Sequence, residues 1–532
     1  MLKKIHIKNY RVFEDFTLDF SEGLNIIVGN NGAGKTTLLE AVHLALTSRI
    51  RGRLLSNELS PHLFNRAAAE AYLSSLAAGE RPAPPEIVID LFLESTVETA
   101  VLKGTNNYAH ENEPGLRVRV SFWDEFADEY EAFVANPEDV RLVPTEYYRV
   151  DWLNFAGNPV TSRGVPASAS MIDAGSIRLQ SGADHYLQQI ITDQLDSKER
   201  VEIARAYRSL REQFSDNPAI GAINEKLAEG QGELTDGKLS LAIDVSPRSA
   251  WETSLVPHLN DLPCQFVGSG GQNMLKVLLA LNRTADAAQI VLIEEPENHQ
   301  SPASLNVLVR KIAERCEGKQ LLVTTHSSYV LNKLGLDRLV LLGTAEDLRL
   351  GALPPDTLDY FKKLSGYDTL RVVLADRIIL VEGPSDELIV QRAYIDAYGK
   401  LPLEAGVDVI NVRGLSAKRF LDIAKPLGKR VAVVTDNDGK EPAEVEARFA
   451  AYTLDSKITI HVGEKEDGST LEPQLVTSCG RRRLNELFGT DNQTDDELAA
   501  YMAANKTSCA LKVFEASDKL PLPQYLIDAI AM

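Results

Sequence analysis

The fold of the first part of this chain is decided by the stretch Gly29-Asn30-Asn31-Gly32-Ala33-Gly34-Lys35-Thr36-Thr37. It matches the P-loop pattern G-x-x-x-x-G-K-[ST] at every fixed position. The largely apolar residues 24–28 predict a buried strand before it, and apolar positions at helical spacing predict a helix after it. Glycines in such a turn let backbone N–H groups face a phosphate, and the helix N-terminus adds positive potential. We therefore predict that residues 29–37 bind ATP, with Lys35 at the β- and γ-phosphates and Thr36 on Mg²⁺.

Two further strands end in residues that an ATP-hydrolysing site needs. The apolar run 290–293 ends in the carboxylates Glu294 and Glu295. We expect Glu294 to orient Mg²⁺-bound water and Glu295 to polarise the attacking water. The strand predicted at 320–325 ends at His326, which can touch the γ-phosphate. Taken alone, His326 fits a solvated loop and residues 29–37 fit a glycine-rich connector, but their order and flanking strands favour an ATPase.

Composition limits the class of protein and its surroundings. The chain has 532 residues, enough for two to four domains, and a net charge of −20, which excludes a general polyanion binder. Any contact with nucleic acid therefore needs a local basic patch. The four cysteines are scattered and predict neither a disulfide framework nor a zinc site, which suits a reducing cytoplasm. No apolar run reaches about eighteen residues, so we expect no membrane span.

A helical stretch is inserted between the P-loop and the carboxylate pair. Residues 186–227 have helical periodicity, and Asp216-Asn217-Pro218 predicts a break between two helices. The apolar face of these helices needs a partner, and both dimerisation and packing on their own domain remain open. Residues 145–185 have no clear period, and we interpret them as a loop that orders on binding or as insertions on one face.

The motifs up to about residue 345 resemble those of the ATP-binding-cassette ATPases, in the branch that includes the SMC and RecF proteins. The resemblance implies that Ser269, Gly270, Gly271 and Gln272 form a signature motif that closes on ATP held by the P-loop of another subunit. It therefore implies a homodimer or a higher homo-oligomer. The chain departs from the family pattern at Gly268, where leucine is usual, and at Glu294, where aspartate is usual.

The C-terminal third has a second α/β pattern in which strands end in carboxylates. The strand predicted at 377–381 ends at Glu382, and Asp386 lies in the first turn of the next helix. The strand at 430–435 ends in Asp436-Asn437-Asp438-Gly439, and further strands are predicted at 407–412 and 458–462. Because the carboxyl ends of parallel strands meet at one edge of a sheet, Glu382, Asp386, Asp436 and Asp438 should crowd one crevice.

Such a crevice favours divalent cations. Four carboxylates repel one another unless cations are bound, and Mg²⁺ or Mn²⁺ prefer oxygen ligands. Taken alone, Asp436-x-Asp438-Gly439 is better explained as a capped turn, and Glu382-Gly383 after a strand also fits a turn. Together, in this order and after predicted strands, they predict a metal site, with two ions expected.

The C-terminal arrangement resembles the Toprim domain of topoisomerases, primases and certain nucleases. An ABC-type ATPase followed by Toprim is the architecture of the OLD (overcoming lysogenisation defect) family. The segments that resemble this family are residues 293–299, 381–386, 435–439, 471–473 and 505–507. The resemblance implies an ATP-linked, metal-dependent DNA endonuclease that serves in defence against phage. It also implies that Glu382 is catalytic, that Glu472 assists the metal cluster and that Lys506 stabilises charge at the scissile phosphate; without it, Lys506 is an ordinary solvated helix residue.

We therefore predict an α/β protein of four segments. These are an N-terminal ATPase part at 1–185, an inserted helical segment at 186–235, a C-terminal ATPase part at 236–355 and a Toprim nuclease domain at 356–532. The expected partners are DNA, further copies of the chain and a neighbouring defence-system protein, in the cytoplasm and away from membranes.

Three functional hypotheses compete. The first is the nuclease, whose DNA backbone contacts could come from Lys418, Arg419, Lys425, Lys429, Arg430 and Arg481–Arg483, although ordinary surface charge explains most of these residues. The second is a non-catalytic, ATP-gated module that binds DNA or a partner through a docking Toprim domain. The third, topoisomerase-like strand passage, requires an attacking tyrosine in a separate domain, and the sequence offers no candidate domain. Arg413 before Gly414 departs from the family pattern and either contacts DNA or has no role.

Overall fold

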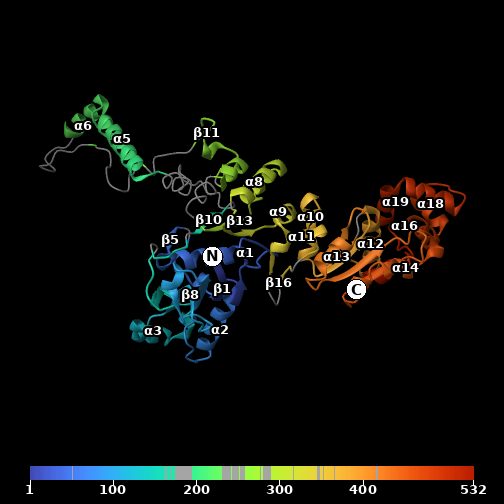
Figure 1. Ribbon diagram of the computed structural model, residues 1–532, viewed down its shortest axis with the longest axis horizontal. Helices are drawn as coiled ribbons and strands as arrows, with labels where there is room; N and C mark the ends of the chain where they lie inside the picture. The colour runs from blue at the N-terminus through green and yellow to red at the C-terminus, as the bar shows by residue number, and fades with distance from the viewer. Residues whose placement is uncertain are drawn as a thin grey trace. The chain divides into compact units, whose positions relative to one another are not determined.

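Two sets of buried strands position the motifs. The structure is a computed structural model that describes the chain except for residues 51, 162–163, 168, 174–194, 230–240, 242–250, 252–257, 276, 279–288, 316, 344–347, 351–352, 365 and 415–416. The described residues fall into two units, one of residues 1–24 and 36–324 and the other of residues 25–35 and 325–532 (Figure 1). The four-segment division predicted from sequence stays a prediction.

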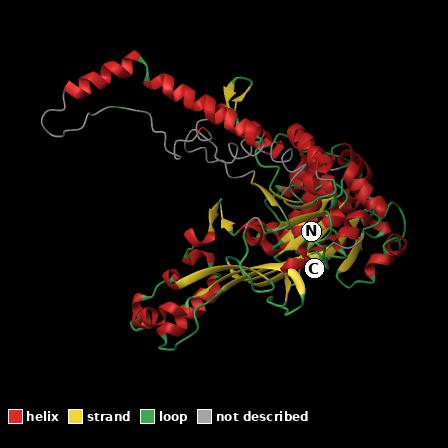
Figure 2. Ribbon diagram, turned by 60° about the vertical axis from the view of Figure 1, so that its left-hand side comes forward, coloured by secondary structure: helices red, strands yellow, loops and turns green. Residues whose placement is uncertain are grey.

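The first unit contains an antiparallel sheet of alternating apolar strands (Figure 2). Its strands follow the order β2-β1-β6-β8-β7, and β9 pairs with β8. Asp90 lies fully buried in this sheet, where the guanidinium of Arg117 pairs with it at 2.6 Å and satisfies its charge. The strands are β1 (Leu2–Tyr10), β2 (Phe13–Asp19), β6 (Ile87–Leu93), β7 (Lys103–Gly104), β8 (Glu113–Phe122) and β9 (Tyr148–Asn154), with helices α2 (Arg66–Ala77) and α3 (Ala127–Val134).

Parallel strands in the same unit hold the carboxylate pair. β13 (Ile290–Glu294) lies between β10 (Ala169–Asp173) and β14 (Gln320–Thr324), and all three are parallel. The run Ile290–Ile293 is fully buried, as expected of a central strand. The helix α8 (Pro302–Arg315) connects β13 to β14. Because Glu294 is in register with Thr324, the carboxylate pair and the start of the segment with His326 leave the sheet at the same edge.

The interpretation of residues 145–185 as a loop is wrong for two segments, β9 and β10. The inserted helices α5 (Ser197–Ser215) and α6 (Pro218–Glu229) are separated at Asp216 and Asn217, as predicted. The predicted start of this helical stretch, 186–194, lies outside the described residues. Along α5 the side chains of Val201, Leu210 and Phe214 are exposed.

The second unit begins with the P-loop strand. β3 (Leu24–Gly29) pairs in parallel with β15 (Leu339–Leu342), which pairs with β16 (Leu348–Arg349). Along the chain, three helices of this unit precede the C-terminal sheet: α9 (Ser328–Leu334), α10 (Pro355–Lys363) and α11 (Thr369–Leu374). The helix α1 (Lys35–Thr47), which belongs to the first unit from Thr36 onward, follows the P-loop directly along the chain, so strand, turn and helix occur in the predicted order.

Buried hydrogen bonds connect α9 to α11, and we call these contacts the α9–α11 joint. The Thr369 hydroxyl donates to Asn332 Oδ1 at 2.6 Å, and Asn332 Nδ2 donates to the Tyr367 carbonyl at 3.0 Å. The Leu370 N–H donates to the Ser328 hydroxyl at 3.3 Å. From α11, Arg371 Nε donates to Asp408 in the C-terminal sheet at 3.1 Å. The segment that follows His326 is therefore linked through α11 to that sheet.

The C-terminal α/β region, coloured orange to red in Figure 1, contains a four-stranded parallel sheet of order β18-β17-β19-β20. Its strands are β17 (Arg377–Val381), β18 (Val407–Asn411), β19 (Arg430–Thr435) and β20 (Ile458–Val462), which confirms the predicted strands. Its helices are α12 (Pro384–Tyr398), α13 (Lys418–Ala424), α14 (Pro442–Ala447), α15 (Ala450–Thr453), α16 (Leu471–Cys479), α17 (Arg481–Phe488), α18 (Asp495–Ala504), α19 (Lys506–Phe514) and α20 (Gln524–Ile530). In the part of the chain that the structure describes, no helix has the length and apolar character needed to cross a bilayer.

Candidate functional sites

The P-loop has the backbone shape that a phosphate cradle requires. Gly32 and Gly34 have φ angles of +80° and +100°, which favour glycine. A Cβ on Gly29 would lie 2.9 Å from the Ala33 Cβ, so this position also requires glycine. Lys35 is only 7% exposed, and its ammonium donates to the carbonyls of Gly29 at 2.9 Å and Asn30 at 3.2 Å. The lysine is thereby held over the loop where the motif predicts phosphate.

The hydroxyl and the carboxylate expected to serve Mg²⁺ are brought together. Thr36 Oγ1 donates a hydrogen bond to Glu294 Oε1. Glutamate in place of the usual aspartate therefore reaches the P-loop threonine directly. Glu295 has a φ of +42°, and Asn298 Nδ2 donates to Glu295 Oε2 at 2.8 Å, so the second carboxylate is oriented by its own turn. His326 follows Thr324, the last residue of β14, by two positions.

The signature segment is bound to the residues that follow the carboxylate pair. Residues 269–275 are helical, and Ser269 is exposed while Gln272 is buried. Gln300 Nε2 donates to the Gly270 carbonyl at 3.1 Å, and Asn273 Nδ2 donates to the Asn298 carbonyl at 3.0 Å. An exposed Ser269 is what a motif that acts on another subunit requires.

Gly270→Ala should damage the ATPase. A Cβ at Gly270 would lie 2.4 Å from the His299 carbonyl oxygen, a backbone atom, so the signature helix must shift away from residues 298–300. Relief of such a clash costs about 1–3 kcal/mol. We expect a loss of ATP hydrolysis of roughly 10-fold or more, measured as phosphate release, since roughly 1.4 kcal/mol corresponds to tenfold. Gly268→Ala is the matched control, because a Cβ there meets no atom within 4 Å; equal activity of the two variants would contradict this role for the contact.

A cluster of carboxylates occupies the carboxyl edge of the C-terminal sheet, and we call Glu382, Asp386, Asp436 and Glu472 the acidic cluster. Glu382 leaves β17 and accepts hydrogen bonds from the Thr435 hydroxyl and from the Asp436 N–H at 3.0 Å. Asp386 accepts from the Gly383 N–H at 2.9 Å at the start of α12. The neighbouring strands β17 and β19 therefore deliver Glu382 and Asp436 to one place, as predicted.

The electrostatics of the acidic cluster show that its charges are crowded. Burial, followed by the charges of Asp386, Glu382 and Glu472, raises the pKa of Asp436 to about 8. Burial and then the nearby carboxylates raise the pKa of Asp386 to about 6, against the lowering effect of the Gly383 N–H. Both shifts have the sign expected when anions lack a compensating cation. Carboxylate oxygens are the ligands that a hard divalent ion prefers, so the chemistry of these side chains suits such an ion.

Glu472 and Lys506, which only the resemblance indicated, join this cluster. Glu472 is 5% exposed and accepts from the Thr470 hydroxyl at 2.9 Å. Lys506, at the start of α19, pairs with Glu472 at 3.0 Å, and this hydrogen bond is the largest cause that raises the Lys506 pKa. The ammonium also interacts electrostatically with Asp436 and Asp386. Their motifs lie far downstream of the strands, so no local spacing rule could have linked them to the site.

Asp438 differs from the other predicted ligands in its placement. It is exposed and has a φ of +51° in the turn after β19. The buried residue of this turn is Asn437, which donates to the Gly463 carbonyl at 3.0 Å and to the Gly468 carbonyl at 2.8 Å. The role of Asp438 as a ligand stays a prediction. Among the described residues, no group of three or more His, Cys, Asp or Glu side chains is arranged so that it could hold a metal ion. Glu382, Asp386 and Glu472 instead each accept a hydrogen bond from a protein group.

Models of known protein families match segments in both the N-terminal and the C-terminal part of the chain. Residues 4–74 match a family model described as an AAA domain, and residues 173–331 match one described as an AAA ATPase domain. Residues 373–438, which carry Glu382, Asp386 and Asp436, match the model described as "Overcoming lysogenization defect protein-like, TOPRIM domain". The chain combines segments similar to AAA ATPase domains with a segment similar to the Toprim domain of OLD-like proteins. Its C-terminal α/β region is thus a Toprim domain, and Glu472 and Lys506 lie beyond the matched segment.

Two relatives match most of the length of this chain. Endonuclease GajA of Bacillus cereus (strain VD045) is 22% identical over 524 residues, which cover 91% of this chain and 83% of that protein. Retron Ec83 probable ATPase of Escherichia coli is 23% identical over 65% of this chain and 72% of its own length. Among solved structures, the Smc head domain derived from Pyrococcus furiosus is 15% identical, with a TM-score of 0.34 over 68% of this chain and 99% of that chain.

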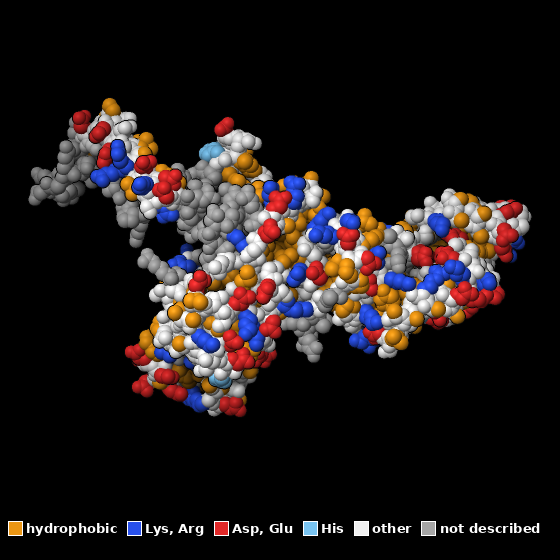
Figure 3. Space-filling view, viewed as in Figure 1, with side chains coloured by type: hydrophobic (Ala, Val, Ile, Leu, Met, Phe, Trp, Pro, Cys, Tyr) orange, Lys and Arg blue, Asp and Glu red, His pale blue; other side chains and the backbone are white. Residues whose placement is uncertain are grey.

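Several basic residues considered for DNA binding in the Toprim domain contact neighbouring side chains. The Arg419 guanidinium lies 4.6 Å from the Tyr360 ring centroid and pairs with Asp356 at 3.2 Å. Arg413 lies over Tyr367 at 5.5 Å. Lys418 and Lys425 also lie over aromatic rings, each at 5.7 Å. On the face shown in Figure 3, basic and acidic side chains are interspersed in this region, which favours the interpretation of most of them as structural or surface charge.

Proposed function

We propose that this chain is an ATP-linked, metal-dependent DNA endonuclease. One observation carries the proposal: a crowded acidic cluster with a paired lysine lies at the carboxyl edge of a Toprim sheet, in a chain that also has a P-loop and a carboxylate pair. The relative GajA is named an endonuclease, and the shared length of the two chains supports the same activity here.

The residues of the acidic cluster would hold Mg²⁺ or Mn²⁺, and two such ions would supply an activated water and stabilise the leaving oxygen. Lys506 would stabilise the charge that develops on the phosphate, because an ammonium cannot ligate a cation. Glu472 positions Lys506 through the 3.0 Å contact. Glu382 accepts hydrogen bonds from the Thr435 hydroxyl and the Asp436 N–H, and these two bonds fix the orientation of its carboxylate beside Asp436.

At the other site, ATP would be held by the P-loop and hydrolysed with Glu295 as the group that polarises water. Asn298 orients the Glu295 carboxylate, and Thr36 and Glu294 are already in contact for a shared Mg²⁺. The signature segment would complete this site from a second subunit. The α9–α11 joint supports a connection between nucleotide state and the Toprim domain, since it begins directly after His326.

The direct test is nicking of supercoiled plasmid with Mg²⁺ or Mn²⁺, run beside phosphate release from ATP. Cleavage that EDTA abolishes supports the proposal. Intact plasmid under all metal and nucleotide conditions, with ATP hydrolysis present, would favour the non-catalytic, ATP-gated module instead. We further propose that the nuclease acts in anti-phage defence with a protein encoded nearby, which a plaque assay with and without the neighbouring genes would test.

We expect a dimer or a higher homo-oligomer. Ser269 is exposed, and the signature motif of a cassette ATPase acts on the P-loop of another subunit. The apolar side chains exposed along α5 offer a further contact surface. Light scattering coupled to gel filtration, with and without ATP, measures this directly. A strict monomer under both conditions would contradict the composite ATP site.

A further inference from the structure

The turn that follows β18 contains an arginine in a backbone conformation that arginine rarely adopts. Arg413 has a φ angle of +54°, in the left-handed region that glycine and asparagine tolerate best. Residues held in such conformations gather at active sites and at turns that bind ligands. The Arg413 side chain is therefore a candidate for a role that outweighs the strain of its backbone.

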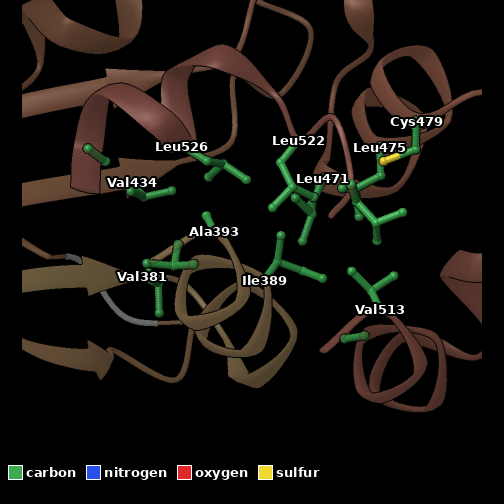
Figure 4. Packing of buried hydrophobic residues seen from close by; sticks show 14 of the residues in the cluster. Val381, Ile389, Ala393, Val434, Leu471, Leu475, Cys479, Val513, Leu522 and Leu526 are labelled. Atoms are coloured by element: carbon green, nitrogen blue, oxygen red, sulfur yellow. The ribbon is translucent and has the colours of Figure 1, made fainter. Parts of the chain in front are cut away.

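Backbone hydrogen bonds attach this turn to the strand end that carries Glu382. The Val412 N–H donates to the Val381 carbonyl at 2.8 Å, and the Gly414 N–H donates to the Glu382 carbonyl at 2.8 Å. Val381 packs in the hydrophobic core of the Toprim domain (Figure 4), so the turn is anchored to a close-packed part of the fold. Arg413 lies between these two bonds along the chain. Its backbone is therefore held beside the first residue of the acidic cluster.

The Arg413 guanidinium lies at the carboxyl edge of the sheet, against the ring of Tyr367. Its central carbon is 5.5 Å from the ring centroid. The helix α11 fixes the level of this contact, because Arg371 Nε donates to Asp408, the second residue of β18, at 3.1 Å. Tyr367 lies four residues before Arg371, and Arg413 lies just beyond the end of β18. The two segments therefore run in opposite directions, and ring and guanidinium meet where the strand ends.

Arg413 differs from other basic residues of this domain because no carboxylate neutralises its charge. It is exposed, and in the part of the chain that the structure describes it forms no ion pair. By contrast, Arg419 pairs with Asp356 at 3.2 Å, and Lys506 pairs with Glu472 at 3.0 Å. A guanidinium stacked on an aromatic ring can still donate hydrogen bonds in its own plane. Arg413 therefore presents an oriented cation to solvent at the carboxyl edge.

We propose that Arg413 binds a backbone phosphate of the DNA beside the scissile bond. The acidic cluster repels the DNA backbone wherever metal ions do not face it, so a fixed cation is needed to hold the strand next to the cluster. A guanidinium suits this task because its two parallel N–H donors match the oxygens of a phosphate. This inference rests on the proposed endonuclease function and names a residue that holds the substrate at that site.

The test compares Arg413→Asn with Arg430→Asn in the full-length protein. Asparagine tolerates the left-handed backbone, so Arg413→Asn removes the charge and keeps the turn. The control removes an exposed arginine at the first position of β19, six residues before Asp436 and about 20 Å from it along the strand. We measure the affinity for a fluorescein-labelled DNA duplex with Ca²⁺ in place of Mg²⁺ at several salt concentrations. The KM and kcat of plasmid nicking, ATP hydrolysis and the thermal unfolding midpoint are measured beside it.

We expect Arg413→Asn to bind the duplex roughly 10-fold more weakly or worse, because a hydrogen bond to a charged group contributes about this factor. The slope of log affinity against log salt should fall by about one, since one phosphate contact is lost. The KM for plasmid should rise in proportion while kcat stays, because the contact is the same before and during the reaction. Arg413→Lys keeps the charge and should keep the salt dependence. Arg430→Asn should match the parent in every measurement, and Arg413→Asn should match it in ATP hydrolysis and unfolding midpoint.

Equal affinity of Arg413→Asn and the parent would overturn the phosphate contact. Weaker binding with the salt dependence of the parent, or a lower kcat at unchanged KM, would also overturn it, because Arg413 would then act only through the turn that holds Glu382. An equal loss in Arg430→Asn would refute it by showing that only the net charge of the domain matters. If the parent binds the duplex but never nicks plasmid, the endonuclease function fails, and the salt dependence of Arg413→Asn still decides whether Arg413 contacts DNA.

Discussion

Replacement of Asp436 by asparagine should abolish plasmid nicking while ATP hydrolysis continues. Asp436 follows the last residue of β19, and burial and then the charges of Asp386, Glu382 and Glu472 raise its pKa. Asparagine keeps the shape but removes the charge that a divalent ion needs. We expect the nicking rate to fall by roughly 1,000-fold or more, as for other residues without which a catalytic unit cannot work.

The control for Asp436→Asn is Glu446→Gln, which removes one carboxylate from an exposed position of α14 in the same domain. Nicking by this control should match the parent, because its side chain lies in solvent. Phosphate release should be equal for all three proteins. If Asp436→Asn cut plasmid as fast as the parent, the acidic cluster would not be the nuclease site, and the non-catalytic hypothesis would gain.

Lys35→Ala should abolish ATP binding. The Lys35 ammonium is held within the loop by two backbone carbonyls and is the principal point charge that the P-loop offers to the β- and γ-phosphates. Two such contacts to charged oxygens correspond to about 3 kcal/mol or more, so we expect a loss of affinity of roughly 100-fold or greater. Titration with a fluorescent ATP analogue measures it.

Lys8→Ala serves as the matched change, since Lys8 is an exposed lysine on β1. Nucleotide affinity of this variant should equal that of the parent. The same two proteins, assayed for nicking, show whether the Toprim domain depends on nucleotide binding. Unchanged affinity in Lys35→Ala would remove the P-loop assignment altogether.

Strands with continuous buried runs could be predicted from the sequence alone. β13, β17 and β19 are apolar on both faces and end in acidic or glycine-rich turns, so their position and direction follow from local residues. The sequence does not predict β9 and β10. β9 has several half-buried residues and little alternation, and β10 is a short five-residue strand whose sequence, Ala-Ser-Met-Ile-Asp, has no clear apolar run.

The residues of the candidate site likewise divide into those that the sequence could place and those that it could not. Glu382 and Asp436 could be placed together because parallel strands converge at one edge. Lys506 and Glu472 come from later helices, and their approach to the cluster depends on how α16 and α19 pack. No spacing in the sequence encodes this packing. The exposure of Asp438 beside a buried Asn437 likewise follows from the turn after β19, where Asn437 satisfies carbonyls of a distant loop.

The α9–α11 joint limits how such chains can be shuffled in evolution. Asn332 and Thr369 are 1% and 0% exposed, and each satisfies a polar group of the other's segment. A Toprim domain exchanged without its matching α9 would leave a buried amide or hydroxyl unpaired, at a cost of about 1–3 kcal/mol. The two sides of this joint should therefore be inherited together. We expect the residues of α9 after His326 and those of α11 before the Toprim sheet to co-vary among relatives.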